Sequence, residues 1–127
     1  MFKILLIDDQ EDIRELASVG FDLLDGFILT EASTGEEGLE VARREVPDLV
    51  LLDFMMPGLS GPDVIKCLKE CPRTACLPVV FMTARATGED EILMTSLGAA
   101  GVIRKPFDPL QLPLEISKYL KKSRAAA

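Results

Sequence analysis

Five short, nearly continuous runs of apolar residues are the feature that most limits what this 127-residue chain can fold into. Such runs suit strands that are buried on both faces, which is typical of a parallel sheet covered by helices on both sides. They are FKILLI at 2–7, GFILT at 26–30, LVLL at 49–52, PVVFM at 78–82 and GVIR at 101–104. The sequence therefore predicts a sheet of five strands.

Segments with helix start signals separate these runs. Ser33 with Glu36, and Thr34 with Glu37, both have the spacing of a capping box ahead of a helix that runs to about Glu45. Further start signals are Gly61-Pro62-Asp63, Thr87 before Gly88, and Asp108-Pro109. The regular alternation of strands and helices predicts one doubly wound α/β domain.

The last helix contains a proline where a helix would need its N–H. Pro113 lies five residues after Asp108, on a segment whose apolar residues recur on one face. We therefore expect this helix to start late or to bend. The residues on that face are Leu112, Ile116, Tyr119 and Leu120. We place the domain at residues 1–121, followed by a short, frayed tail at 122–127.

The charge balance and the apolar pattern limit the partners of the domain. With 21 acidic against 14 basic residues, nothing neutralises a row of nucleic-acid phosphates, so we expect no nucleic-acid binding. No run approaches the roughly 20 apolar residues that span a bilayer, and the N-terminus shows no signal peptide. We expect a cytoplasmic protein without membrane contact. Because the chain has no histidine to complete a metal site, we expect its three cysteines, Cys67, Cys71 and Cys76, to be free thiols that are buried or half-buried.

Polar residues stand where four of the five strands would end. Asp8 and Asp9 follow the first run, Asp53 the third, Thr83 the fourth and Lys105 the fifth. Any one of these residues alone would be an ordinary turn residue or solvated charge. Ligands of open parallel sheets, however, bind beyond the carboxyl ends of the strands. We therefore expect all five side chains to meet at one edge of the sheet.

Three carboxylates in one cleft repel each other. Each like-charged pair costs roughly 4 kcal/mol at about 4 Å and an effective dielectric constant near 20. Lys105 offsets part of this repulsion, and a divalent cation offsets more. Oxygen ligands favour Mg²⁺, or Mn²⁺, over zinc, and Mg²⁺ keeps coordination positions for water and phosphate. With a hydroxyl from Thr83 to donate a hydrogen bond, the set indicates phosphoryl chemistry.

The motifs LLIDDQEDIRELA, LVLLDFMMPGLSG, VVFMTA and IRKPF resemble, in order and spacing, those of the receiver domain of bacterial response regulators. The resemblance covers Phe2 to about Leu120. It implies a flavodoxin-like sheet with strand order 2-1-3-4-5. It also implies that Asp53 takes a phosphoryl group from a sensor histidine kinase or a histidine phosphotransfer protein in a Mg²⁺-dependent reaction. Such a module catalyses only its own phosphorylation and dephosphorylation, and is not an enzyme that acts on other substrates.

The resemblance also implies a role for each site residue. Asp9, Asp53 and the main-chain carbonyl of Met55 would hold Mg²⁺, and Asp8 would act mainly through a metal-bound water. The phosphoryl oxygens would be bound by Thr83, Lys105 and the main-chain N–H groups of Met55 and Ala84. The Lys105–Pro106 peptide bond is commonly cis in this family.

Two features depart from the common pattern of the family. Val102 stands where the family often has an aromatic residue that moves together with the threonine, here Thr83, when the domain is phosphorylated. We therefore expect a smaller conformational change on that face. Met55 and Arg85 occupy the two positions that tune the lifetime of the phosphoryl group, and neither is a water-positioning group. We expect slow self-dephosphorylation.

Three other kinds of protein remain to be compared with these motifs. An aspartyl phosphohydrolase would have a second aspartate two residues after Asp53, where Met55 stands. A nucleotide- or flavin-binding protein would have a glycine-rich turn in place of Asp8 and Asp9. A degenerate receiver that only docks would be expected to lack some of the five key side chains, and all five are present here. The valine at position 102 leaves this third alternative open. Because the chain stops after the last helix, we expect either a stand-alone receiver that acts on a downstream protein target, or a receiver cut from a longer protein with a fused output domain. It would be a monomer or a phosphorylation-dependent dimer.

Overall fold

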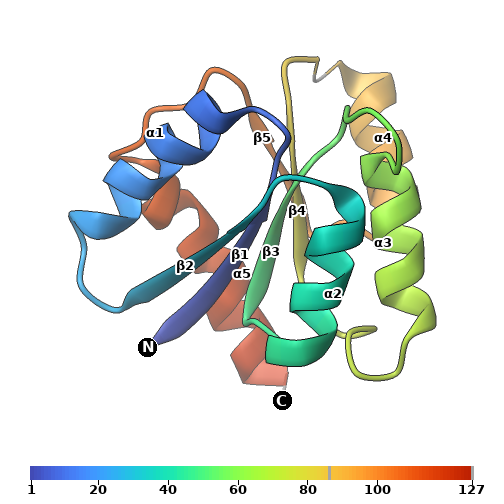
Figure 1. The fold of residues 1–127 in the computed structure, drawn as a ribbon, viewed down its shortest axis with the longest axis horizontal. Helices are drawn as coiled ribbons and strands as arrows, with labels where there is room; N and C mark the ends of the chain where they lie inside the picture. The colour runs from blue at the N-terminus through green and yellow to red at the C-terminus, as the bar shows by residue number, and fades with distance from the viewer. Residues whose placement is uncertain (86, 127) are drawn as a thin grey trace.

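Five parallel strands form one twisted sheet, with helices on both faces (Figure 1). This computed structural model describes residues 1–85 and 87–126. The strand order is β2-β1-β3-β4-β5, which confirms the predicted α/β fold and its topology. In chain order the elements are β1 (Phe2–Ile7), α1 (Glu11–Asp22), β2 (Phe27–Ala32), α2 (Gly35–Glu45), β3 (Leu49–Asp53), α3 (Gly61–Glu70), β4 (Val79–Thr83), α4 (Gly88–Ser96), β5 (Gly101–Arg104) and α5 (Leu112–Ala126).

The central strands of the sheet are buried on both faces, as the apolar runs predict, whereas the edge strands β2 and β5 are largely half-buried or exposed. Every residue of β3 and β4 is buried. Alternate residues of each strand face opposite sides, so Leu5 and Ile7 pack toward α2, α3 and α4, while Ile4 and Leu6 pack toward α1 and α5. Burying each of these aliphatic side chains contributes about 1.5–3 kcal/mol relative to leaving it exposed. The two cores fix the register of the strands and therefore the position of every strand end.

Side-chain caps fix the points where the helices begin. Thr34 is the N-cap of α2 and accepts a hydrogen bond from the Glu37 main-chain N–H at 3.1 Å. The hydroxyl of Ser33 contacts the Glu37 carboxylate instead, so the structure selects the second of the two predicted caps. Full capping boxes begin α3 and α4, and they are formed by Ser60 with Asp63 and by Thr87 with Asp90.

Helix α5 starts late, as Pro113 predicts. It begins at Leu112, so Pro113 lies in the first turn. A main-chain N–H there would have no acceptor within the helix, so its absence in proline costs no hydrogen bond. The preceding turn is closed by the carbonyl of Asp108, which accepts a hydrogen bond from Leu112 N–H at 3.0 Å. The backbone of α5 continues through Ala126, into the residues assigned to the tail, and residue 127 lies outside the described residues. The domain boundary at residue 121 remains a prediction.

No helix in the described residues is long and apolar enough to cross a membrane. Cys67, Cys71 and Cys76 form no disulfide and are free thiols, as predicted. Cys67 and Cys71 are half-buried as expected, whereas Cys76 is exposed, so the expected burial is wrong for Cys76.

Gly61, the first residue of α3, packs directly against the end of β3. A Cβ atom at this position would lie 2.6 Å from the main-chain oxygen of Asp53 and 2.8 Å from the Cα of Phe54. Backbone atoms cannot move aside without moving Asp53. We predict that Gly61→Ala lowers the free energy of unfolding by about 1–3 kcal/mol, measured by urea denaturation. Gly88→Ala is the matched control, because Gly88 also begins a helix and a Cβ there meets nothing within 4 Å. Equal effects of the two substitutions would contradict this account.

Candidate functional site

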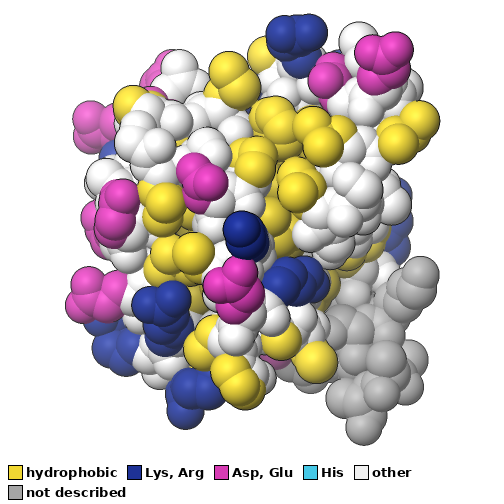
Figure 2. All heavy atoms as spheres, turned by 90° about the vertical axis from the view of Figure 1, so that its right-hand side faces the viewer, with side chains coloured by type: hydrophobic (Ala, Val, Ile, Leu, Met, Phe, Trp, Pro, Cys, Tyr) yellow, Lys and Arg dark blue, Asp and Glu magenta, His cyan; other side chains and the backbone are white. Residues whose placement is uncertain are grey.

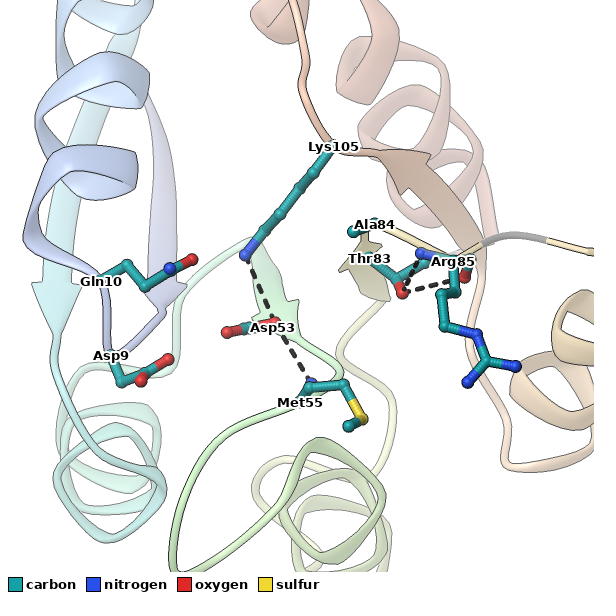
Figure 3. A pocket seen from close by; sticks show the side chains of 8 residues that line it. All are labelled: Asp9, Gln10, Asp53, Met55, Thr83, Ala84, Arg85 and Lys105. Carbon is teal, nitrogen blue, oxygen red and sulfur yellow. Dashed lines mark hydrogen bonds and ion pairs between the residues drawn. The ribbon is translucent and has the colours of Figure 1, made fainter.

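A cleft of about 310 Å³ opens at the carboxyl edge of the sheet, where the strands end (Figure 3). Side chains from β3, β4 and the loops after β1 and β5 reach it, although they are far apart in the sequence. The residues that line it are Asp9, Gln10, Asp53, Met55, Thr83, Ala84, Arg85 and Lys105. The structure thus brings together every predicted site residue except Asp8, which lies beneath the cleft, and Val102.

Three carboxylates lie close together at this edge. Asp8, Asp9 and Asp53 each place one carboxylate oxygen within 4.8 Å of the others. Asp8 is fully buried and Asp53 is 4% exposed, whereas Asp9 is open to solvent. Hard oxygen ligands of this kind, with one open side, suit a divalent cation such as Mg²⁺. The cluster therefore fits the predicted metal site.

Lys105 connects two of these carboxylates from the opposite side of the cleft. Its ammonium Nζ lies 2.8 Å from Asp8 Oδ2 and 3.4 Å from Asp53 Oδ1. Figure 3 shows the side chain extending from the end of β5 down to Asp53. The Lys105–Pro106 peptide bond that follows is cis, as predicted. Because the Lys105 side chain is only 11% exposed, these ion pairs are less screened by solvent than surface pairs.

Asp53 is a buried carboxylate with an elevated proton affinity. Burial, followed by the charge of Asp8, raises its pKa to about 7, while Lys105 and the Met55 main-chain N–H act in the opposite direction. That N–H donates to Asp53 Oδ1 at 3.2 Å, and the second oxygen points toward Asp9 (Figure 3). Without a cation, Asp53 is partly protonated near neutral pH. A cation held between Asp9 and Asp53 would favour the ionised form, which is the form that can act as a nucleophile.

Thr83 is the last residue of β4, and its hydroxyl is engaged in the turn that follows. It donates to the main-chain carbonyl of Arg85 at 2.9 Å and accepts from the Arg85 N–H at 3.0 Å. To donate to a group bound at Asp53, the hydroxyl must give up its bond to the Arg85 carbonyl. The guanidinium of Arg85 points away from Asp53 (Figure 3).

Val102 does not reach the cleft. It lies on β5 opposite Phe81 of β4 and is half-buried in the core on the α4 side of the sheet. Its predicted role as a switch residue is therefore a matter of packing and not of contact with the site.

Two residues that no sequence pattern predicts, Gln10 and Arg14, contact the turn formed by Asp8 and Asp9. The main-chain N–H of Gln10 donates to Asp8 Oδ1 at 2.9 Å, and Arg14 Nη1 donates to the main-chain oxygen of Asp8 at 2.7 Å. Neither contact leaves a pattern in the sequence, because one uses a main-chain donor and the other a main-chain acceptor.

The raised pKa of Asp53 predicts a pH-dependent stability. A carboxyl group whose folded pKa is about 7, against a usual value of 3.8, favours the folded state below about pH 4, and this stability is lost as the pH rises through 7. In EDTA, Asp53→Asn should therefore be more stable than the wild type by about 2 kcal/mol at pH 8. The whole difference between pKa values of 3.8 and about 7 would correspond to about 4 kcal/mol, at ~1.4 kcal/mol per pKa unit. We expect about half of this, because water reaches the cleft and screens the charges. The difference should shrink toward pH 4.

Urea denaturation between pH 4 and pH 8 measures this difference. Asp25→Asn, in an exposed turn, removes the same charge and should show no such dependence. A stability difference between Asp53→Asn and wild type that is the same at pH 5 and pH 8 would contradict the raised pKa.

Comparison with known proteins identifies the family. The model of the response regulator receiver domain matches residues 4–117. The chain is 36% identical over 125 residues to the alkaline phosphatase synthesis transcriptional regulatory protein PhoP of Bacillus subtilis, covering 98% of this chain and 51% of PhoP. It thus spans about half the length of the curated relatives it matches.

Solved structures show the same fold. The chemotaxis protein CheY4 of Vibrio cholerae superposes with a TM-score of 0.86 at 26% identity, over 93% of this chain and 98% of CheY4. NtrX of Brucella abortus superposes with a TM-score of 0.88 at 28% identity, over 98% of this chain but only 28% of NtrX. The match to the family model covers all the strand ends that form the cleft. The chain belongs to the receiver domain family of two-component response regulators.

Proposed function

We propose that Asp53 accepts a phosphoryl group in a Mg²⁺-dependent reaction, and that the domain signals through protein contacts while it carries that group. The observation that supports this most directly is the position of the Asp53 carboxylate. It lies at the floor of an open cleft, next to two other carboxylates and 3.4 Å from an ammonium group. Such a site offers a nucleophile, a cation site and a positive charge for the transferred group.

In this proposal each residue has a distinct role. A carboxylate oxygen of Asp53 attacks phosphorus, and the bond from phosphorus to the donor breaks as the new P–O bond forms. Lys105 balances the charge of the transferred group, and the hydroxyl of Thr83 donates to one of its oxygens after leaving the carbonyl of Arg85. The main-chain N–H groups of Met55 and Ala84 bind the remaining oxygens.

Mg²⁺ would be held by Asp9, Asp53 and the main-chain carbonyl of Met55, with Asp8 as an outer ligand. When bound, it would offset the repulsion between the carboxylates and the incoming phosphoryl oxygens. Mn²⁺ has similar ligand preferences and could replace it.

A phosphohistidine donor would have to be another protein. The chain has no histidine, so it cannot supply a phosphohistidine, and we propose a sensor histidine kinase or a histidine phosphotransfer protein as the donor. Curated relatives are about twice as long, and PhoP is named a transcriptional regulatory protein. These relatives favour an output domain fused to this one, and a separate protein target is the alternative. The cytoplasm is the proposed location.

The surface over α4 supports signalling through protein contacts. Ile92 and Leu93 of α4 are 71% and 47% exposed. Figure 2 shows hydrophobic side chains gathered over the face that includes α3 and α4. Exposed apolar patches of this kind suit a protein partner. Val102, on the neighbouring strand β5, would transmit a change in Thr83 to this surface through packing. Without an aromatic ring at this position, we expect the change to be small.

The stand-alone phosphohydrolase fits the structure less well. Such an enzyme needs an acid–base group beside its nucleophile, and the residue two positions after Asp53 is Met55. Met55 contributes a main-chain N–H to the site, while its side chain is 70% exposed.

Labelling with acetyl phosphate tests the assignment of Asp53. In Mg²⁺, the wild type should incorporate about one phosphoryl group per chain, measured by intact-protein mass spectrometry. Asp53→Ala should incorporate none, and chelation of Mg²⁺ by EDTA should abolish labelling until Mg²⁺ or Mn²⁺ is restored. Asp25→Ala, which removes an exposed carboxylate away from the cleft, is the matched control and should label fully. Unchanged labelling of Asp53→Ala would refute the proposal.

The lifetime of the phosphorylated form is a second test. Met55 and Arg85 line the cleft but offer no group that positions a water for attack on phosphorus. We predict a half-life of minutes or longer in Mg²⁺, followed by mass spectrometry after removal of acetyl phosphate. Met55→Asn places an amide at the mouth of the cleft and should shorten the half-life several-fold. A wild-type half-life of only seconds would contradict the prediction.

A further inference from the structure

Arg14, on helix α1, contacts the turn formed by Asp8 and Asp9, although the proposed phosphoryl chemistry gives Arg14 no role. Its Nη1 donates to the main-chain oxygen of Asp8 at 2.7 Å, and its Nε lies 3.5 Å from Glu31 Oε1 on β2. The Arg14 side chain is only 16% exposed, although it is charged. Arginine is seldom buried to this extent unless both its charge and its donors have partners. The guanidinium therefore joins three elements: the end of β1, helix α1 and strand β2.

The hydrogen bond to Asp8 bears on Asp9 because a peptide unit is rigid. The carbonyl of Asp8 and the N–H of Asp9 lie in one plane, so a bond that holds the first also orients the second. The other two carboxylates have donors of their own: Gln10 and Lys105 for Asp8, and Met55 and Lys105 for Asp53. Among the residues that the structure describes, no N–H or ammonium donor contacts the Asp9 carboxylate. The Asp9 carboxylate lies against that of Asp53, which is the other proposed cation ligand. Without an N–H or ammonium partner in the described part of the chain, the direction of Asp9 depends on its main chain.

We propose that Arg14 is a positioning residue of the cation site: it fixes the Asp8–Asp9 peptide so that Asp9 points into the cleft, and Glu31 holds the guanidinium in place. This inference rests on the proposed function only in taking Mg²⁺ or Mn²⁺ as the ligand. The planar guanidinium suits the role because its Nη1 and Nε donors point in fixed directions toward two different partners. A lysine at this position could keep the charge but not both contacts.

Removing Arg14 has opposite expected effects on cation binding, depending on whether Arg14 positions Asp9 or acts only as a positive charge. If Arg14 acted only as a nearby positive charge, removing it would strengthen cation binding, because the repulsion between the two would be lost. If Arg14 holds Asp9 in place, removing it weakens binding despite that gain. The sign of the change therefore separates the two roles.

Direct titration of the unphosphorylated chain with Mn²⁺, followed by electron paramagnetic resonance, measures this sign. Arg14→Met keeps the length of the side chain but removes every donor, and it should weaken Mn²⁺ binding by about tenfold, as is typical for residues that orient metal ligands. Arg14→Lys should recover part of that loss. Arg44→Met is the matched control, because Arg44 is also a helical arginine with an acidic partner but is 60% exposed on α2. It should leave Mn²⁺ binding unchanged.

Unchanged or tighter Mn²⁺ binding by folded Arg14→Met would overturn the proposal, even if that variant were less stable. If Arg14→Met does not fold, Arg14→Lys decides, because it keeps the positive charge but cannot keep both contacts of the guanidinium. This variant should bind Mn²⁺ more weakly than the wild type, and wild-type affinity would overturn the proposal. A wild type that binds Mn²⁺ but is never phosphorylated would refute the proposed function alone.

A measurement without metal tests the same inference. Amide hydrogen exchange, followed by NMR in EDTA, should show faster exchange at Asp9 and Gln10 in Arg14→Met than in Arg44→Met. Exchange rates at these two amides that match the wild type would mean that Arg14 does not hold the turn.

Discussion

The ion pairs of Lys105 with Asp8 and Asp53 are the interaction on which the site depends. They join the loop after β5 to the ends of β1 and β3, across 97 residues of sequence in the case of Asp8. Without Lys105, two largely buried carboxylates would face each other with no positive charge between them, which costs several kcal/mol at this range. Even with Lys105, burial and then the charge of Asp8 keep the pKa of Asp53 raised to about 7. The three carboxylates still outnumber the one ammonium group, which suits a cation site at this edge. In the proposed function, Lys105 would also balance the charge of the phosphoryl group.

The sheet makes this arrangement possible because its central strands are buried on both faces. Parallel strands of similar length end at one edge, and the two apolar cores fix their register. The site is therefore built on strand ends, while the loops supply main-chain donors such as the Met55 N–H. Gly61 shows how closely the two are connected, because the first residue of α3 touches the main chain of Asp53. A change in helix packing at Gly61 would therefore move the main chain that carries the Asp53 carboxylate.

Much of the fold and the acidic cluster could be predicted from sequence, for a physical reason. Buried strands require continuous apolar runs, and an edge where all strands end collects whatever polar residues follow those runs, such as Asp53 and Thr83. Other features could not be predicted from this pattern. The choice of Thr34 over Ser33 as a cap depends on backbone geometry that both residues could adopt. The contact of Arg14 with the Asp8 carbonyl involves a main-chain acceptor, and Glu31 lies on a different strand, so no spacing in the sequence records either contact. The engagement of the Thr83 hydroxyl by Arg85 likewise depends on the turn after β4.

The central claim is that the ends of four strands form one phosphoryl site around Asp53. NMR spectra of the ¹⁵N-labelled chain, recorded with Mg²⁺ before and after addition of beryllofluoride, test it most directly, because this phosphoryl mimic binds an ionised aspartate without a kinase. We expect the largest amide shifts to occur together at Asp9, Met55, Ala84 and Lys105, and all of them to vanish in Asp53→Ala. Shifts confined to one strand end, or shifts that persist in Asp53→Ala, would contradict it.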